Sequence, residues 1–124
     1  MNTYYAISTQ HSKEGNMGKF SWILDTGAMN HVASSMSLFF THHKIKPIRV
    51  KLPNNNYVIA EIVGTVLLTK QIILYNVLYI PVFTLNIIFV QRLISTLHCQ
   101  LVFSHKVCQI LEKNTCKMIG QVDV

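Results

Sequence analysis

Acidic residues are scarce in this chain: Asp and Glu together number five among 124 residues, against eleven Lys plus Arg. Charged residues make up only 13% of the chain, and hydrophobic residues make up 50%. This composition excludes a mainly disordered chain, because disorder requires low hydrophobicity and high charge. A chain of this length is the usual size of one domain. We therefore expect one folded domain with short loops.

Cysteine is also scarce, and its number is odd: Cys99, Cys108 and Cys116. Their spacings match no paired C-x-x-C ligand set, so we expect free thiols, with no metal and no cofactor. The polar residues at the start of the chain contain no apolar core of a secretory signal. We therefore expect a reducing, cytoplasmic location.

Long hydrophobic runs are limited to residues 71–91, which read "QIILYNVLYIPVFTLNIIFVQ" and carry no charge. The run is about long enough to cross a bilayer. However, Asn76, Pro81 and Asn86 divide it into short pieces rich in Ile, Val, Tyr and Phe. Such pieces favour buried strands separated by a turn, so we expect no membrane span.

The positive charge is concentrated in one segment, residues 42–51. Its members are His42, His43, Lys44, Lys46, Arg49 and Lys51. A dense basic stripe with interleaved aromatic residues is typical of nucleic-acid modules, and this segment is less dense than that. A solvated strand face is the better interpretation, and a nucleic-acid partner stays open as a weakly supported alternative.

The organisation of the chain changes near residue 20. Residues 1–19 are polar and follow neither a two-residue nor a 3.6-residue period, so we expect a disordered leader or linker. Residues 20–122 contain about eight to ten short apolar runs and one or two helical turns. They are expected to form one all-β domain, a small closed β-barrel.

A hairpin is predicted in "IRVKLPNNNYVIAEIVGTVLL", residues 48–68. Apolar and polar residues alternate on both sides of an Asn-rich centre, which is the pattern of two half-buried strands. Pro53 and the Asn residues after it supply turn chemistry, because Asn tolerates positive φ. We expect the tip at Asn54, Asn55 and Asn56, with a bulge or a close backbone approach at Gly64.

Residues 22–30, "WILDTGAMN", place Asp25 at the end of an apolar strand, where a carboxylate is costly to bury. An aspartic protease needs a carboxylate delivered into such a turn. Thr26 would hold the loop by a hydrogen bond, Gly27 would allow close approach of a partner carboxylate, and Ala28 would leave room for substrate. The alternative is a turn aspartate that caps its own backbone.

The protease mechanism requires two carboxylates that share one proton. The chain has one D-T-G, so it would need a symmetric homodimer in which each chain supplies Asp25. Other chemistry is more weakly indicated. His31 with Ser34 or Ser35 offers a base and a nucleophile, but there is no G-x-S-x-G and all three lie in one short segment.

From about Trp22 to Gly120 the chain resembles the protease region of copia-type retrotransposon Pol polyproteins, a retropepsin-like group. The resembling blocks are "WILDTGAMNHVASSMSLF", "VKLPNNNYVIAEIVGTVLL", "NVLYIPVFTLNIIFVQRLI", "CQLVF" and "KMIG". The resemblance implies a closed β-barrel aspartic endopeptidase that cleaves the Gag-Pol precursor as a homodimer. Asp25 matches the catalytic residue, Thr26, Gly27 and Ala28 match the active-site loop, and the hairpin at Asn54–Asn56 matches the flap.

Three positions depart from the family pattern. Asn55 replaces a glycine at the hairpin tip, and Cys116 stands where a turn glycine is common. Phe89 replaces a small residue that packs behind the active-site loop, so its ring is expected either to displace that loop or to fill a void. These departures favour an alternative function, a non-catalytic fragment or relic of a copia-type Pol that keeps the barrel as a structural or interaction domain.

Overall fold

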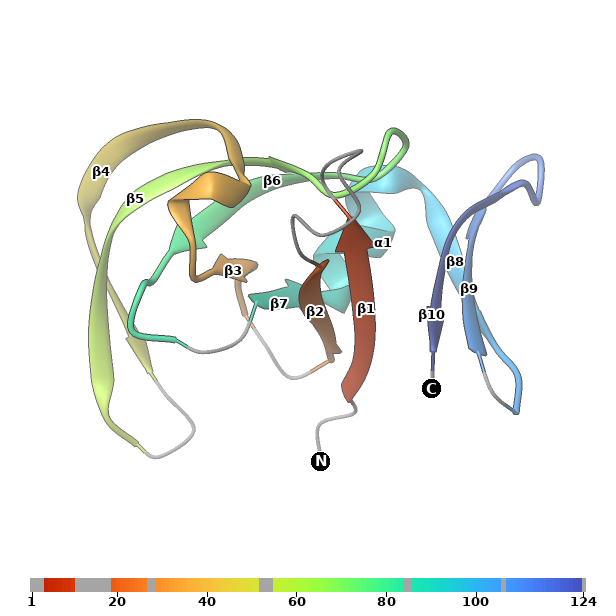
Figure 1. Cartoon of the computed structure of the whole chain (residues 1–124), viewed down its shortest axis with the longest axis horizontal. Coiled ribbons are helices and arrows are strands. Elements are labelled where there is room, and N and C mark those ends of the chain that lie inside the picture. Colours follow the sequence, from red (N-terminus) through yellow and green to blue (C-terminus); the bar gives the residue numbers. More distant parts are fainter. Residues whose placement is uncertain are drawn as a thin grey trace.

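The structure, a computed structural model, describes residues 4–10, 19–26, 29–51, 55–83, 86–105 and 107–123. Strands dominate these residues (Figure 1). The elements are β1 (Tyr4–Gln10), β2 (Lys19–Asp25), β3 (Val32–Ala33), a 3-10 turn η1 (Met36–Leu38), β4 (Phe39–Lys51), β5 (Tyr57–Leu67), β6 (Ile73–Tyr79), β7 (Asn86–Phe89), α1 (Val90–Leu97), β8 (Cys99–Phe103), β9 (Val107–Glu112) and β10 (Met118–Asp123). The mostly β fold with short helical segments is as expected.

The strands are hydrogen-bonded in the order β4-β5-β6-β3-β7-β2-β1-β10-β9-β8. Most neighbours are antiparallel, but β2 pairs with β7 and β3 pairs with β6 in parallel. β6 and β7 follow each other in sequence, yet β3 lies between them. The chain after β2 therefore returns into the middle of the sheet, next to the strand that flanks β2.

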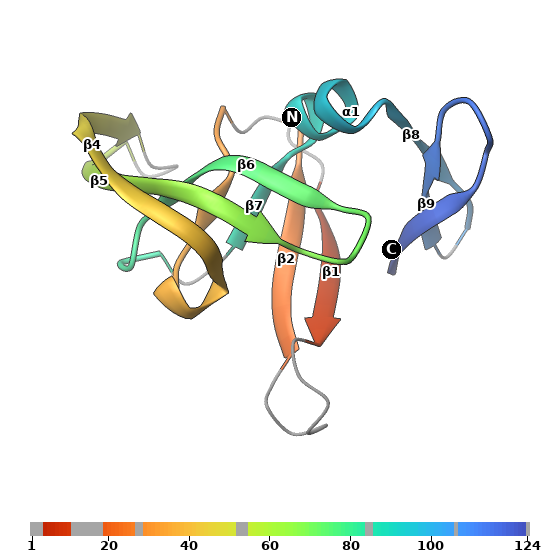
Figure 2. The same cartoon turned by 90° about the horizontal axis from the view of Figure 1, so that it is seen from above.

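The closed barrel expected from the sequence is not found among the described residues. β4 and β8 end the strand order as open edges, and β1 and β10 are joined by one residue pair, Ala6 with Asp123. That narrow junction divides the strands into two open portions, which lie at opposite ends of the molecule in Figure 2. An alternating pattern tells which face of a strand is buried, but it does not tell whether the edges of the sheet meet.

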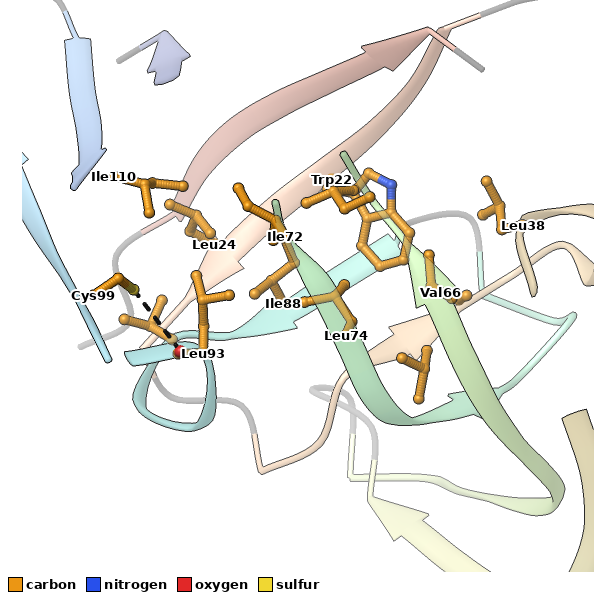
Figure 3. Close-up of a cluster of buried hydrophobic side chains, with 14 of the residues drawn as sticks. Trp22, Leu24, Leu38, Val66, Ile72, Leu74, Ile88, Leu93, Cys99 and Ile110 are labelled. Atoms are coloured by element: carbon orange, nitrogen blue, oxygen red, sulfur yellow. Dashed lines mark hydrogen bonds between the residues drawn. The ribbon is translucent and has the colours of Figure 1, made fainter. Parts of the chain in front are cut away.

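The main hydrophobic core lies between the strands around β2 (Figure 3). Trp22 and Leu24 of β2, Ile88 of β7 and Leu74 of β6 are at most 1% exposed. A second, smaller cluster comprises Val32, Ala60, Val63, Leu78 and Ile80. Because alternate residues of a strand point to opposite faces, β2 buries Trp22 and Leu24 on the face opposite Asp25.

Helix α1 covers the main core next to β8. Val90 and Leu93 are buried, and Ile94 and Leu97 pack partly against the core, which is the i, i+3, i+4, i+7 spacing of an amphipathic helix. The helix ends where His98 adopts the left-handed conformation, with φ 48° and ψ 50°. This turn directs the chain into β8.

The predicted hairpin is present as β4 and β5, which pair from Phe39 with Val66 to Lys51 with Tyr57. Gly64 provides the expected close approach, since a Cβ there would overlap the backbone oxygen of Thr41. The apolar run 71–91 forms β6 and β7 and begins α1, as expected of buried strands. Across the described residues, no helix has the length and apolarity needed to span a bilayer.

The first nineteen residues differ from expectation, because Tyr4–Gln10 forms β1 and pairs with the whole of β2. This strand, "YYAISTQ", begins with apolar and aromatic residues but has no regular alternation of apolar and polar residues, so it was not predicted. Residues 11–18 lie outside the described part. The domain boundaries at residues 20 and 122 stay a prediction.

Candidate active site

Asp25 is the last residue of β2 and is 6% exposed. β2 lies between β1 and β7, so the backbone of Asp25 pairs with Tyr4 on one side and with Phe89 on the other. Neither neighbour is a carboxylic acid. The structure therefore places the sequence-predicted carboxylate at a buried strand end, where local pairing brings no second carboxylate.

Phe89 shares a face of the sheet with Asp25, because directly paired residues of neighbouring strands point the same way. Its side chain is half-buried, and the Arg92 guanidinium lies 5.6 Å from the centre of its ring. The β2–β7 pairing runs from Trp22 with Asn86 to Asp25 with Phe89 without a register shift. The strands thus accommodate this large residue beside Asp25.

His31 anchors the far end of the loop that follows Asp25. Its side chain is 1% exposed, and its Nδ1 accepts a hydrogen bond of 2.9 Å from the backbone N–H of Phe89. Its backbone carbonyl accepts another, also 2.9 Å, from the N–H of Leu78. His31 therefore ties the loop to β7 and to β6 at the same time.

The ionisation of His31 fits this role. Burial, and secondly the positive charge of Arg92, lower the pKa of His31 from 6.5 to about 4. The imidazole is consequently neutral at neutral pH and keeps a lone pair on Nδ1 for the Phe89 N–H. Protonation would replace that acceptor with a donor and break the contact.

Asn86 makes a second anchor, just beyond β3. Its Oδ1 accepts hydrogen bonds from the backbone N–H of Ser34 at 2.9 Å and from the Ser34 hydroxyl at 3.1 Å. Asn86 is 7% exposed. It is the first residue of β7 and pairs with Trp22 of β2. The hydrogen bonds of two side chains, His31 and Asn86, therefore hold the C-terminal end of the segment that runs from Asp25 to Ser34.

The serine–histidine alternative finds no support in these bonds. Ser34 donates to Asn86, and Ser35 Oγ lies 2.8 Å from Ser37 Oγ at the start of η1. The His31 Nδ1 is occupied by the Phe89 N–H. Ser34, Ser35 and His31 therefore each have a structural hydrogen-bond partner that is not a member of the predicted nucleophile–base pair.

Of the remaining loop residues, Thr26 is exposed, while Gly27 and Ala28 lie outside the described residues. A cavity of about 320 Å³ opens next to Thr26, between β2, α1 and β8. Its walls include Leu24, Val90 and Ile94. Because Leu24 points to the face of β2 opposite Asp25, this cavity lies on that opposite face. It is therefore not a substrate site next to the carboxylate.

The predicted flap is the tip of the β4–β5 hairpin. Asn55 and Asn56 are exposed, and Asn54 lies outside the described residues. Asn55 has φ 68°, the left-handed conformation in which glycine is common and Asn is tolerated. In Figure 1 the C-terminal end of β4, the N-terminal end of β5 and the C-terminal end of β2 all lie toward the lower side of the view.

The three cysteines are free thiols. Cys99 and Cys108 are buried, and burial raises the pKa of both thiols. Cys116 is exposed with φ 58°, which agrees with its place at a turn where a glycine is common. Within the part of the chain that the structure describes, no three His, Cys, Asp or Glu side chains gather as a metal site.

Two anchors were not predicted from the sequence, the imidazole of His31 as a backbone acceptor and the amide of Asn86. A partial signal existed for Asn86, which is a single polar residue inside the apolar stretch "LNIIF", whereas His31 follows the polar Asn30 in "NHVA". The sequence did not show which residue each side chain would contact, because the two contacts join residues that are 58 and 52 positions apart.

The chain was compared with models of known families. The family described as "Pol polyprotein, beta-barrel domain" matches residues 22–97, which is more than half of the chain. The matched region begins at the buried Trp22, contains Asp25 and the β4–β5 hairpin, and ends with helix α1. No curated protein and no solved structure matches the chain.

Proposed function

The chain belongs to the Pol polyprotein, beta-barrel domain family, and on that premise we propose that it is an aspartic endopeptidase domain. Two copies associate, each supplies Asp25, and the pair cleaves peptide bonds of a retrotransposon Gag-Pol precursor. One observation carries the proposal: Asp25 is buried at a strand end, and the loop that follows it is bound to β6 and β7.

The reaction uses two carboxylates that hold one proton between them. The ionised member takes a proton from a water molecule, whose oxygen attacks the scissile carbonyl carbon, while the protonated member donates to the carbonyl oxygen. The C–N bond then breaks, and the amine leaves with a proton. This reaction requires that the carboxylate be held accurately in place. The hydrogen bonds that attach the loop at His31 and Ser34 would serve to hold it there.

The homodimer follows from what one chain lacks. The sequence contains one D-T-G, whereas the mechanism needs two such carboxylates. A two-fold axis next to Asp25 would supply the second carboxylate from a second copy. The β4–β5 hairpin, whose tip is predicted at Asn54–Asn56, would close over the bound peptide as a flap. The strand ends that lead to this tip lie toward the same side as the end of β2 in Figure 1.

The direct test is Asp25→Asn, which keeps the shape of the side chain and removes the shared proton. Cleavage of a copia-type Gag-Pol precursor should fall at least about 100-fold, with an acidic optimum for the unaltered chain. The matched control is Glu61→Gln, which removes an exposed carboxylate from β5 and should leave cleavage unchanged. Cleavage that survives Asp25→Asn would refute the assignment.

A second candidate is a non-catalytic domain that keeps the β fold for interaction. It is favoured by the bulky Phe89 on the same face as Asp25 and by the open edges at β4 and β8. Analytical ultracentrifugation separates the two. A dimer is required by the protease, whereas a stable monomer that cuts no precursor favours the second candidate.

A further inference from the structure

The end of the β4–β5 hairpin has two unlike faces. Val50 and Val58, which are paired with each other, and Ala60 turn toward the second core cluster. Alternation sends the residues between them to the opposite face. That outer face consists of two further pairs, Arg49 with Ile59 and Lys51 with Tyr57.

All four residues of the outer face are exposed, and two of them already stack. Tyr57 is 52% exposed and Ile59 is 51% exposed. The Arg49 guanidinium lies 4.0 Å from the centre of the Tyr57 ring. A guanidinium stacked on a ring forms a flat platform that attracts further π-systems, and Lys51 adds a second cation beside it.

The charge around this face is mainly positive, although the exposed Glu61 lies on the same side of β5 as Tyr57 and Ile59. Between Asp25 and Glu61 the sequence contains no acidic residue. The cations and histidines of β4 are His42, His43, Lys44, Lys46, Arg49 and Lys51, and all of them are exposed. β4 is also an edge of the sheet, so no further strand covers it among the described residues.

Protection against edge-to-edge aggregation explains part of this pattern. Lysines and a proline on an edge strand discourage pairing with other chains, and β4 carries Lys44, Lys46 and Pro47. That purpose does not require an exposed tyrosine stacked by an arginine at the hairpin end. The combination of a stacking platform and adjacent cations fits the bases and phosphates of a nucleic acid.

We propose that the outer face of the hairpin, formed by Arg49, Lys51, Tyr57 and Ile59, binds single-stranded nucleic acid. A base extends the stack of Arg49 and Tyr57, and Lys51 meets a neighbouring phosphate. A single strand is specified because its bases are free to stack, whereas those of a duplex are paired inside it. The proposal does not depend on Asp25 and goes beyond the proposed protease activity.

Fluorescence anisotropy of the full chain with labelled oligo(U), and separately with oligo(dT), tests the proposal. We expect a Kd on the order of 10⁻⁵ M at low salt, weakening steeply as salt rises. Tyr57→Ala should weaken binding about tenfold, while Tyr57→Phe, which keeps the ring, should bind like the unaltered chain. Arg49→Lys should keep the salt dependence and lose part of the affinity, because it keeps the charge and loses the plane.

Lys117→Gln is the matched charge control, since Lys117 is exposed near β9 and β10, in the other portion of the sheet. It should leave the affinity nearly unchanged, whereas Lys51→Gln should weaken binding and reduce the salt slope by about 0.7. Equal losses for these two variants would reduce the effect to net charge and overturn the proposal. So would full binding by Tyr57→Ala, or equal affinity for a duplex. Asp25→Asn should bind like the unaltered chain, which separates this outcome from that of the protease test.

Discussion

The segment after β2 and the tip of the β4–β5 hairpin are both turns between strands, yet they are built in opposite ways. The first runs from buried Asp25 to buried His31, which bonds to two strands distant in sequence. The second joins strands that pair only locally, and Lys51, Asn55 and Tyr57 are exposed. A turn bound by distant strands holds a side chain in place, as catalysis requires, while a local hairpin leaves its outer face to a partner.

The largest expected difference is in the cost of losing an apolar side chain from β7, the strand to which the first segment is bound, compared with the outer face of the hairpin. Ile88→Ala removes a 0%-exposed side chain that pairs with Leu24 in the main core. It should lower the free energy of unfolding by about 2–5 kcal/mol. Ile59→Ala, on the outer face of the hairpin, should cost less than about 1 kcal/mol. Urea unfolding of both variants measures the contrast, and equal costs would contradict it.

The next effect depends on pH and acts only on the loop after β2. The pKa of His31 is lowered to about 4 in the folded chain and is 6.5 when unfolded. The unfolded chain therefore binds a proton first, and stability that is fully present above pH 6.5 is lost as the pH falls toward 4. The loss should reach about 3 kcal/mol. It also sets an acid limit to any activity that depends on this loop.

The pH dependence is measured by unfolding at several pH values between about 4 and 7. The comparison is between the unaltered chain and His31→Asn, which cannot titrate in this range. Because all other groups titrate in both proteins, the difference isolates His31. The variant should be less stable at pH 7 and should show a flatter profile. Parallel profiles would show that His31 does not carry this dependence.

The smallest effect concerns the hairpin tip. Asn55 has φ 68°, so Asn55→Gly removes backbone strain while it adds freedom to the unfolded chain, and the two nearly cancel. We expect a change within about 0.5 kcal/mol. Asn56→Gly is the control, because Asn56 is not at positive φ and gains nothing from glycine. It should be the less stable variant in thermal unfolding, and the reverse order would contradict the turn assignment.

Features that depend on neighbouring residues were predicted from the sequence. They include the end of β2 at Asp25, the β4–β5 hairpin whose tip was predicted at Asn54–Asn56, and the strands within residues 71–91. Each rests on a local pattern, either alternation of apolar residues or turn chemistry. The prediction of a closed barrel was wrong for the described residues, because closure depends on where the two distant edges of the sheet lie.

The sequence by itself determined that this is a β domain with a lone carboxylate at a strand end and a basic hairpin. These properties follow from composition, from period-two alternation and from the residue types at the turns. Only the tertiary structure decided that β3 returns between β6 and β7, that His31 meets the Phe89 N–H, and that Arg49 stacks on Tyr57. The physical reason is that burial and pairing between distant segments depend on the path of the whole chain, which no local pattern encodes.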